Sequence, residues 1–133
     1  IFNSNEIRFI PGPQWNDLST ESISNILKQP FYTSLNSNRM GYKLKGPSLQ
    51  LMEEKTYLSS AVTRGTMQLL PNGELIVLMA NHQTIGGYAN IGQIILVDLP
   101  KLVQHKSDTP FRFSITNAET AQSEYKQMQK CFS

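Results

Sequence analysis

The sequence predicts a mainly β fold, a small closed β-barrel with a few short helices and a C-terminal helix. Three observations predict it: short β-prone runs recur along the chain, hairpin turns join most of them, and helical patterns are few. At 133 residues the chain is about the length of one domain. We therefore expect a single domain over residues 1–133.

The N-terminal part predicts a strand, a helix and a hairpin. Residues 7–10 read IRFI, and this strand is expected to stop at Pro-Gly-Pro because proline cannot donate a hydrogen bond to a sheet. Ser19 or Thr20 can cap a short helix. Residues 29–44 place two β-prone runs around the turn-forming Asn-Ser-Asn, which predicts a hairpin. The apolar face of the helix is expected to carry Ile23, Ile26 and Leu27.

The middle of the chain predicts a second hairpin and a polar loop. In residues 65–80, Pro71-Asn72-Gly73 separates two apolar runs, and Asn-Gly accepts the positive φ angles of tight turns. Residues 81–90 read NHQTIGGYAN, and we expect a loop there before a strand over residues 91–98. A loop with many side-chain donors between two strands is a common place for a functional site.

The C-terminal part predicts a helical turn, a strand and a helix. LPKLVQ, residues 99–104, favours the helical turn, and Asn117 is a good N-cap for the last helix. Residues 110–116 alternate as in a half-buried strand, with Phe111, Phe113 and Ile115 on one face. The inward face of the last helix is expected to carry Ala118, Ala121, Tyr125 and Met128.

Composition excludes several classes of protein. The net charge of +2 comes from 12 basic and 10 acidic residues scattered along the chain, so the basic face of a nucleic-acid-binding protein is missing. The longest apolar runs are strand-sized and too short to span a membrane. No signal-peptide pattern begins the chain, and we expect a cytoplasmic location. Because the chain begins with Ile1 and not with methionine, we expect the natural polypeptide to be longer.

The sequence gives no sign of a metal site or a disulfide. Cys131 is the only cysteine, and no Cys/His cluster has metal-ligand spacing. His105 is expected to be a surface residue, whereas His82 lies in the polar loop, where imidazole can donate, accept or titrate. No stretch matches a phosphate-binding loop or a hydrolase motif.

Several side chains have the chemistry of a binding site. Arg39 can hold a carboxylate or phosphate through two parallel hydrogen bonds, although a solvent-exposed hairpin arginine explains it equally well. Gln68, Gln83 and Thr84 are neutral groups of the kind that read an amide or a ureido ring. A structural role is the alternative for each of them.

The segment QTIGGY is harder to explain by a purely structural role. Gly86 and Gly87 allow close backbone approach, and their amides can bind a carbonyl or an anion. Tyr42 and Tyr88 each offer a rigid ring with a polar tip, with packing in or at the rim of the core as the alternative.

A series of motifs in this order resembles a known family. IPGPQ, SNRMGYKLKGP, GTMQLLPNGELIVLMANHQTIGGY and ILVDLPKLVQ are similar to the second half of allophanate hydrolase subunit 2 proteins. This family is also described as KipA-like, as the C component of 5-oxoprolinase and as related to biotin-dependent carboxyltransferases. The resemblance covers nearly the whole chain. It implies a cyclophilin-like barrel, and it makes this chain the C-terminal half of a longer protein built from two such barrels.

The resemblance also implies partners and an activity. The expected partners are a KipI-like subunit or domain, the N-terminal barrel of the same protein and a LamB/YcsF-like subunit. Relatives belong to ATP-dependent 5-oxoprolinase, which opens a cyclic amide, or to the carboxyltransferase part of urea carboxylase. ATP or biotin is then a cofactor of the full complex, and neither is assigned to this domain. The isolated domain is expected to be inactive; the alternative is a non-catalytic docking module of a KipI/KipA-type kinase-inhibitor system.

The resemblance implies that the motif residues line a substrate cleft at the junction with the KipI-like partner. It assigns a catalytic role to none of them. The expected substrate-binding set is Arg39, Met40, Gly41, Tyr42, Gln83, Thr84, Gly86, Gly87, Tyr88, Gln68 and Gln14. The chain departs from the family pattern where Arg64 replaces a proline and Ile85 replaces a threonine. Asn81 stands where the family commonly has an aspartate, which removes a carboxylate able to act as a base.

Overall fold

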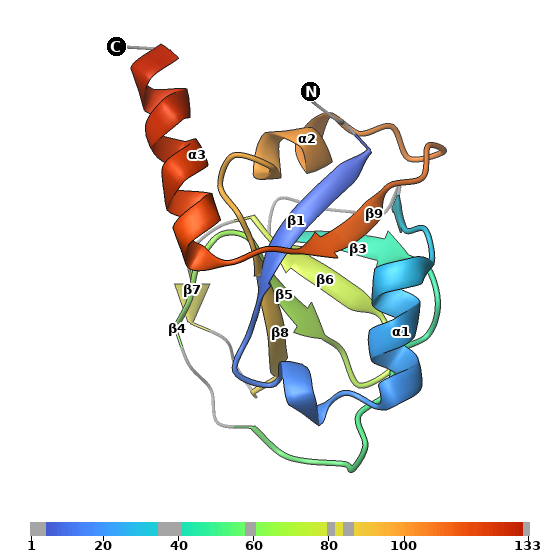
Figure 1. The fold of residues 1–133 in the computed structure, drawn as a ribbon. Coiled ribbons are helices and arrows are strands. Elements are labelled where there is room, and N and C mark those ends of the chain that lie inside the picture. The colour runs from blue at the N-terminus through green and yellow to red at the C-terminus, as the bar shows by residue number, and fades with distance from the viewer. Residues whose placement is uncertain (1–4, 35–40, 58–60, 80–81, 84–86, 132–133) are drawn as a thin grey trace.

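A curled β-sheet forms the body of the protein in the computed structural model, which describes residues 5–34, 41–57, 61–79, 82–83 and 87–131 (Figure 1). Among these residues, seven strands form the sheet in the order β2-β3-β6-β5-β8-β1-β9. Their bounds are β1 Glu6–Pro11, β2 Tyr32–Thr33, β3 Gly41–Lys45, β5 Thr66–Leu69, β6 Leu75–Leu78, β8 Ala89–Ile94 and β9 Arg112–Ile115. The mainly β prediction is confirmed.

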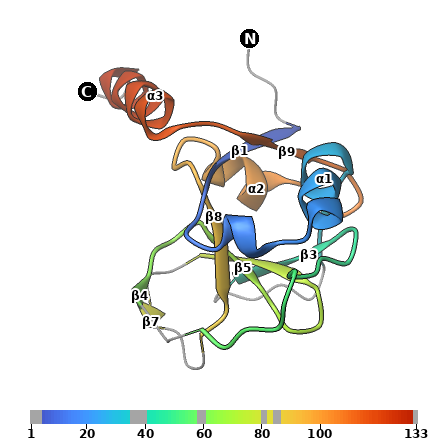
Figure 2. The same ribbon diagram turned by 60° about the horizontal axis from the view of Figure 1, so that its bottom comes forward.

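A second, two-stranded sheet lies to one side of the main sheet (Figure 2). It pairs β4 (Ala61–Val62) with β7 (His82–Gln83). The described helices are η1 (Trp15–Asp17), α1 (Thr20–Lys28), α2 (Leu99–Gln104) and α3 (Ala118–Cys131). The prediction of a loop over all of residues 81–90 is therefore wrong, because part of this stretch pairs with β4 and its end belongs to β8.

The strand expected over residues 91–98 is also displaced. β8 begins at Ala89 and ends at Ile94, where its last residue pairs with Phe9 of β1. The chain then turns toward α2, and the Asp98 N–H donates to the Ile95 carbonyl. Apolar residues continue to Val97, but among the described residues the last backbone–backbone hydrogen bond from this stretch to β1 is the one from the Ile95 N–H to the Arg8 carbonyl, at 3.2 Å.

The edges of the main sheet approach each other at one place in the described part of the chain. Phe31, just before β2, and Phe111, just before β9, exchange two backbone hydrogen bonds of 2.9 Å. Neighbouring strands of the main sheet are antiparallel, except β1 and β9, which are parallel. A curled sheet is thus established, and the closed, cyclophilin-like barrel stays a prediction.

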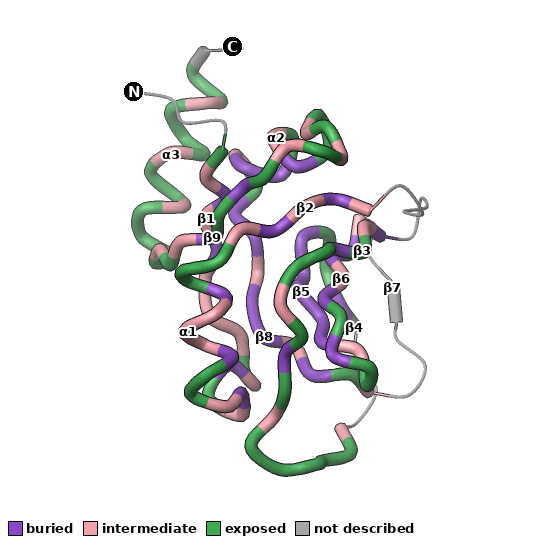
Figure 3. Tube along the Cα trace, turned by 90° about the vertical axis from the view of Figure 1, so that its right-hand side faces the viewer, coloured by how far each residue is buried: buried purple, intermediate pink, exposed green. Residues whose placement is uncertain are grey.

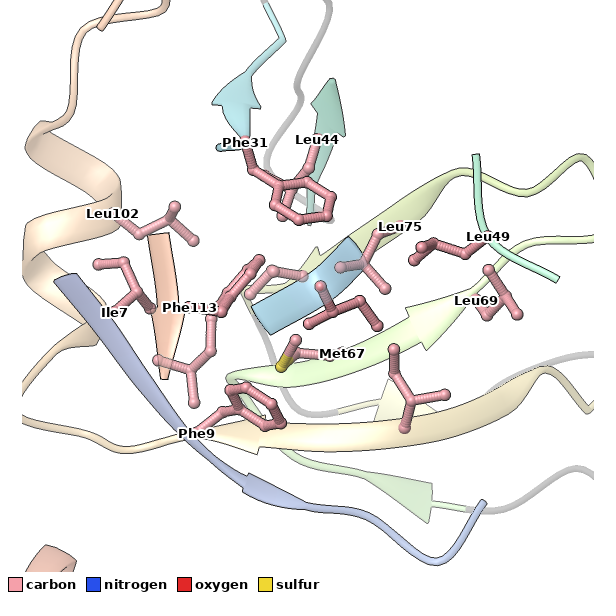
Figure 4. Packing of buried hydrophobic residues seen from close by; sticks show 14 of the residues in the cluster. Ile7, Phe9, Phe31, Leu44, Leu49, Met67, Leu69, Leu75, Leu102 and Phe113 are labelled. Atoms are coloured by element: carbon pink, nitrogen blue, oxygen red, sulfur yellow. The ribbon is translucent and has the colours of Figure 1, made fainter. Parts of the chain in front are cut away.

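The core lies inside the curl and is rich in aromatic rings (Figure 4). Phe113 of β9 contacts three other phenylalanine rings, with centroids 5.8 Å from Phe9, 5.2 Å from Phe31 and 5.3 Å from Phe111. Met67 of β5 is completely buried beside them. Rings from elements that are far apart in sequence therefore hold the two ends of the sheet together.

The predicted β5–β6 hairpin is confirmed, and its turn explains the glycine. The Gly73 N–H donates to the Leu70 carbonyl and the Leu70 N–H to the Glu74 carbonyl, both at 2.9 Å. Gly73 has a φ angle of +90°, the conformation that glycine adopts without strain, whereas no described residue other than glycine has a positive φ. This is a type I turn followed by a bulge rather than a two-residue turn.

Burial corrects three expectations about apolar faces (Figure 3). Leu27 is 36% exposed on α1, and Ile115 is 47% exposed near the end of β9. On α3, Ala118 and Tyr125 are exposed, while Ala121 and Met128 are half-buried. α3 extends away from the sheet in both ribbon views, so its periodic face has little surface to pack against (Figures 1 and 2).

Of the two predicted caps of α1, Ser19 and Thr20, the structure shows Ser19. Its Oγ accepts a hydrogen bond from the Ser22 N–H at 3.1 Å and donates to the Ser22 Oγ, which in turn accepts from the Gln50 N–H. We expect Ser19→Ala to lower the free energy of unfolding by about 1 kcal/mol. Urea denaturation measures this change. Ser24→Ala in the same helix is the control, and an equal loss in both variants would contradict the cap assignment.

Candidate functional site

A row of side chains crosses the outer face of the sheet. The strand register aligns Lys43 of β3 with Ile76 of β6, Ile76 with Gln68 of β5, and Gln68 with Asn90 of β8. Their neighbours along the strands, such as Met67 and Val77, belong to the core, so these four residues lie on the opposite face. We call Lys43, Ile76, Gln68 and Asn90 the outer row. Gln68 is only 3% exposed.

Gln14 joins the outer row at Asn90. The Asn90 N–H donates to Gln14 Oε1 at 2.8 Å, and the Gln14 N–H donates to the Asn90 carbonyl at 3.0 Å. Gly12 lies so close that a Cβ on it would be 2.6 Å from Asn90 Oδ1. That Oδ1 is buried and has no hydrogen-bond partner among the described residues. Two of the predicted site residues, Gln14 and Gln68, are thus connected through Asn90.

A groove of about 760 Å³ opens near the end of the curled sheet. Residues 49–57, 69–71 and 87–89 line it. Leu49, Leu69 and Ala89 are buried and give it an apolar floor, whereas Tyr88 is 39% exposed. The remaining lining includes charged side chains, so the groove as a whole is more polar than apolar. Its volume lies within the range of small-molecule sites. The predicted residues Gly87 and Tyr88 form part of its wall.

A tyrosine and a carboxylate fasten one wall of this groove. The Tyr57 hydroxyl donates to Asp17 Oδ2 at 3.0 Å, and Lys55 Nζ lies 3.3 Å from Asp17 Oδ1. Burial, together with the hydrogen bond to Asp17, raises the pKa of Tyr57 to about 12. The hydroxyl is therefore neutral at physiological pH and serves as a donor. The backbone of Tyr57 also forms an antiparallel bridge with Gly87.

The other predicted site residues divide into two groups. Gly41 and Tyr42 begin β3, where Gly41 pairs with Leu78 and Tyr42 packs against the core. Gln83 lies on β7, with Ala61 as its partner. Arg39, Met40, Thr84 and Gly86 lie outside the described residues, so the cleft that these motifs were expected to form stays a prediction.

Sequence reasoning did not single out Asn90, Asp17 or Tyr57. Their partners are far away in the chain: 76 residues separate Gln14 from Asn90, and 40 separate Asp17 from Tyr57. His105 also differs from the expected surface residue, because it is half-buried, with Nε2 2.8 Å from the Thr109 carbonyl oxygen and its ring against Phe111. No local sequence pattern predicts the contacts of Asn90, Asp17 or Tyr57, whereas those of His105 are with residues four and six positions further along.

The described residues contain neither a cluster of potential metal ligands nor a membrane-spanning helix. None of these residues form a group of three or more His, Cys, Asp or Glu that could hold a metal ion. In the same part of the chain, no helix is long and apolar enough to cross a membrane.

The model of the carboxyltransferase domain family, subdomains A and B, matches residues 2–115, which is most of the chain. The chain belongs to this carboxyltransferase family. Its similarity to the C component of 5-oxoprolinase from Escherichia coli (strain K12) is 35% identity over 128 residues, 96% of this chain and 41% of the relative. The corresponding protein of Haemophilus influenzae is 32% identical over 115 residues, 86% of this chain and 37% of the relative.

Two much larger solved structures share the fold. The Kluyveromyces lactis urea amidolyase aligns with 98% of this chain at a TM-score of 0.84 and 17% identity, over 8% of its own length. The urea carboxylase of the same organism aligns at a TM-score of 0.80 and 16% identity, over 98% of this chain and 12% of its own length. The chain thus spans less than half of each relative. The family assignment rests on the family model and the two 5-oxoprolinase relatives, and these two structures show the shared fold.

Proposed function

We propose that this domain is part of an ATP-dependent 5-oxoprolinase, as the C-terminal barrel of its C component. The observation that supports this most is the identity to that component of the Escherichia coli enzyme, which extends over 96% of this chain. In this proposal the domain forms a substrate cleft with a KipI-like partner in the cytoplasm. It is the second of two barrels, and a LamB/YcsF-like protein completes the complex.

The chemistry of the candidate site suits a cyclic amide. Opening an amide ring develops negative charge on the carbonyl oxygen, and pre-positioned N–H donors stabilise that charge. In this proposal, the amide groups of Gln68 and Gln14 supply donors and acceptors at the outer row without adding charge. The backbone at Gly87 belongs to the groove, whose lining does not include Gln68 or Gln14, and can supply them there. The buried position of Gln68 would strengthen its hydrogen bonds, because the local dielectric constant is low.

A biotin-dependent carboxyltransferase of the urea carboxylase type is the second candidate function. The family model, named for carboxyltransferase subdomains A and B, favours it. A ureido ring presents the same carbonyl and N–H groups as a lactam, so the same neutral side chains suit both. In either proposal, ATP or biotin is bound by the full complex, and this domain contributes substrate contacts.

Reconstitution tests the proposed function directly. The full-length protein is combined with its KipI-like and LamB/YcsF-like partners, and ATP-dependent loss of 5-oxoproline is measured while one component is omitted at a time. We expect turnover only when all components are present. No turnover from folded, assembled components would reject the 5-oxoprolinase proposal and leave carboxylation or a non-catalytic docking role.

Gln68→Leu is the variant that tests the outer row. Leucine has a similar volume, so the fold should tolerate it, but the amide donors and acceptor are lost. We expect turnover by the reconstituted complex to fall at least about tenfold, the effect of one lost transition-state hydrogen bond. Thermal unfolding and gel filtration would show unchanged stability and assembly.

Gln127→Leu on α3 provides the matched control, since it makes the same chemical change on an exposed helix. Equal turnover by Gln68→Leu and the unmodified protein would remove Gln68 from the site. Arg39→Ala in the same assay tests the arginine: lost turnover with intact assembly supports a substrate contact, whereas lost assembly with intact turnover per complex supports docking.

A further inference from the structure

A closed ring of contacts includes two residues of the groove lining, Tyr57 and Gly87. It passes through Gln14, Asp17, Tyr57, Gly87 and Asn90, and we call it the groove ring. Each link is either a hydrogen bond, a backbone bridge or a short stretch of chain. The ring connects the Gly12-Pro13-Gln14 turn, η1, the segment before residue 58 and the start of β8.

The first half of the groove ring ties β8 to η1. The Asn90 N–H donates to Gln14 Oε1 at 2.8 Å, and the Asp17 N–H donates to the Gln14 carbonyl at 3.0 Å. These two bonds place the Asp17 carboxylate at a fixed position relative to β8. Asp17 is then available as an anchor for a segment that is distant in the sequence.

The second half returns from Asp17 to β8. The Tyr57 hydroxyl donates to Asp17 Oδ2 at 3.0 Å, the Tyr57 backbone bridges to Gly87, and the chain from Gly87 leads directly to Asn90. The hydroxyl–carboxylate bond is the link of this ring that joins two side chains. Removal of a single oxygen atom, as in Tyr57→Phe, therefore opens the ring and leaves the aromatic ring in place.

The segment that carries Tyr57 has other attachments, at its beginning and at Lys55. The Ser19 N–H donates to the Gln50 carbonyl, and the Met52 N–H donates to the Asp17 carbonyl, both at 2.9 Å. Between Met52 and Tyr57 the side chains of Glu53, Glu54 and Lys55 are exposed. Lys55 Nζ lies 3.3 Å from Asp17 Oδ1, but solvent screens an ion pair this exposed, so it holds the segment weakly. Tyr57 is thus where this segment is fastened to both η1 and β8.

We propose that Asp17 and Tyr57 are positioning residues for the groove, which hold residues 87–90 in the conformation that binds substrate. This inference rests on the proposed function, because it takes the groove wall at Gly87 and Tyr88 as part of the substrate site. Asp17 and Tyr57 act through the backbone of Gly87 and do not contact substrate. When the ring opens, the binding-competent fraction of the protein falls, and the apparent affinity falls in proportion.

Amide hydrogen exchange on the assembled full-length protein tests the ring without reference to activity. We expect Tyr57→Phe to speed exchange of the backbone amides of residues 87–90 about tenfold, as expected for the loss of one hydrogen bond to a charged acceptor. Tyr125→Phe, the same atomic change on exposed α3, should leave these amides unchanged. Equal exchange at residues 87–90 in Tyr57→Phe and Tyr125→Phe would overturn the inference.

Kinetics tests the positioning role in the reconstituted complex. Tyr57→Phe should raise the KM for 5-oxoproline about tenfold, with kcat changed by less than about twofold, because the closed fraction falls while the closed state is unaltered. Asp17→Ala combined with Tyr57→Phe should be no worse than Asp17→Ala alone, since both changes open the same ring. If the two changes raised the KM additively, Asp17 and Tyr57 would not act through the same link, and the inference would be wrong.

The two proposals fail in different ways. If the unmodified complex does not turn over 5-oxoproline, the proposed function fails, and the exchange experiment still decides whether the ring positions residues 87–90. If the unmodified complex turns over 5-oxoproline and Tyr57→Phe speeds exchange but leaves KM unchanged, the positioning role is wrong and the proposed function stands.

Discussion

Phe113→Ala is expected to lower the free energy of unfolding by about 3 to 5 kcal/mol, the usual cost of a large cavity in a packed core. The Phe113 side chain is 3% exposed, and its ring lies between those of Phe9, Phe31 and Phe111. Its removal breaks three edge-on ring contacts at once, each of which adds to the burial of apolar area. The neighbouring rings come from different elements, so the cavity cannot close without moving the ends of the sheet.

Ile115→Ala is the matched control, because it truncates an apolar side chain two residues along the same strand. Ile115 is 47% exposed, so its loss should cost less than about 1 kcal/mol. Urea denaturation followed by circular dichroism measures both variants. If Phe113→Ala and Ile115→Ala lowered the free energy of unfolding by similar amounts, the aromatic cluster would not dominate the stability of this sheet.

Asp98→Ala is also expected to have a large effect. It should lower the free energy of unfolding by about 3 to 5 kcal/mol, the cost of removing one partner from a buried ion pair. The Asp98 carboxylate is completely buried. It accepts hydrogen bonds from the Arg8 N–H at 2.8 Å, from Arg8 Nε at 2.9 Å and from Arg8 Nη2 at 2.9 Å. Lys101 Nζ lies 3.1 Å from the same carboxylate and is itself largely buried. The substitution leaves two cations facing an apolar side chain.

The same network predicts how stability depends on acid. Burial alone would raise the pKa of Asp98, but the hydrogen bonds from Arg8 and Lys101 outweigh it and hold the pKa below its usual value. The hydrogen bond from Arg8 likewise lowers the pKa of Glu124. A carboxyl whose pKa is lower in the folded state stabilises the fold above its unfolded-state pKa, and this stabilisation is lost as the pH falls through the folded-state value.

Denaturation curves measured from neutral to acidic pH test this network. The unmodified protein should lose stability as the pH falls below the ordinary range of carboxyl groups, and Asp98→Ala should show a flatter dependence. Asp108→Ala removes an exposed carboxylate close by in the sequence and should keep the full dependence. An unchanged slope in Asp98→Ala would assign the acid sensitivity to other carboxyl groups.

Local signals in the sequence predict the elements well where the signal is contained in one short stretch. Ser19 caps α1, and Pro71-Asn72-Gly73 turns the β5–β6 hairpin, as the residue types indicate. The last helix shows the limit of such signals. Its spacing of apolar residues predicts a helix correctly, but whether that face is buried depends on a surface elsewhere in the chain.

The candidate site could be predicted only in part, for a similar reason. Gln14 and Gln68 stand in motifs that mark the family, yet the residue that connects them, Asn90, is set by the strand register and by a bulge between β5 and β8. Gly41 and Tyr42 are adjacent in one motif, but successive residues of a strand point to opposite faces. A motif read as one wall of a site therefore supplies residues to two different surfaces.

The parallel pairing of β1 with β9 has a consequence for synthesis of the chain on the ribosome. Glu6 pairs with Arg112, and Phe9 with Ile115. The first described strand therefore cannot form this pairing until the last one has been synthesised. Until those residues emerge, β1 has an unpaired edge, which is the kind of surface on which nascent chains associate wrongly. Contacts between residues this distant in sequence slow folding. We therefore expect the sheet to be completed late, after nearly the whole domain has emerged from the ribosome.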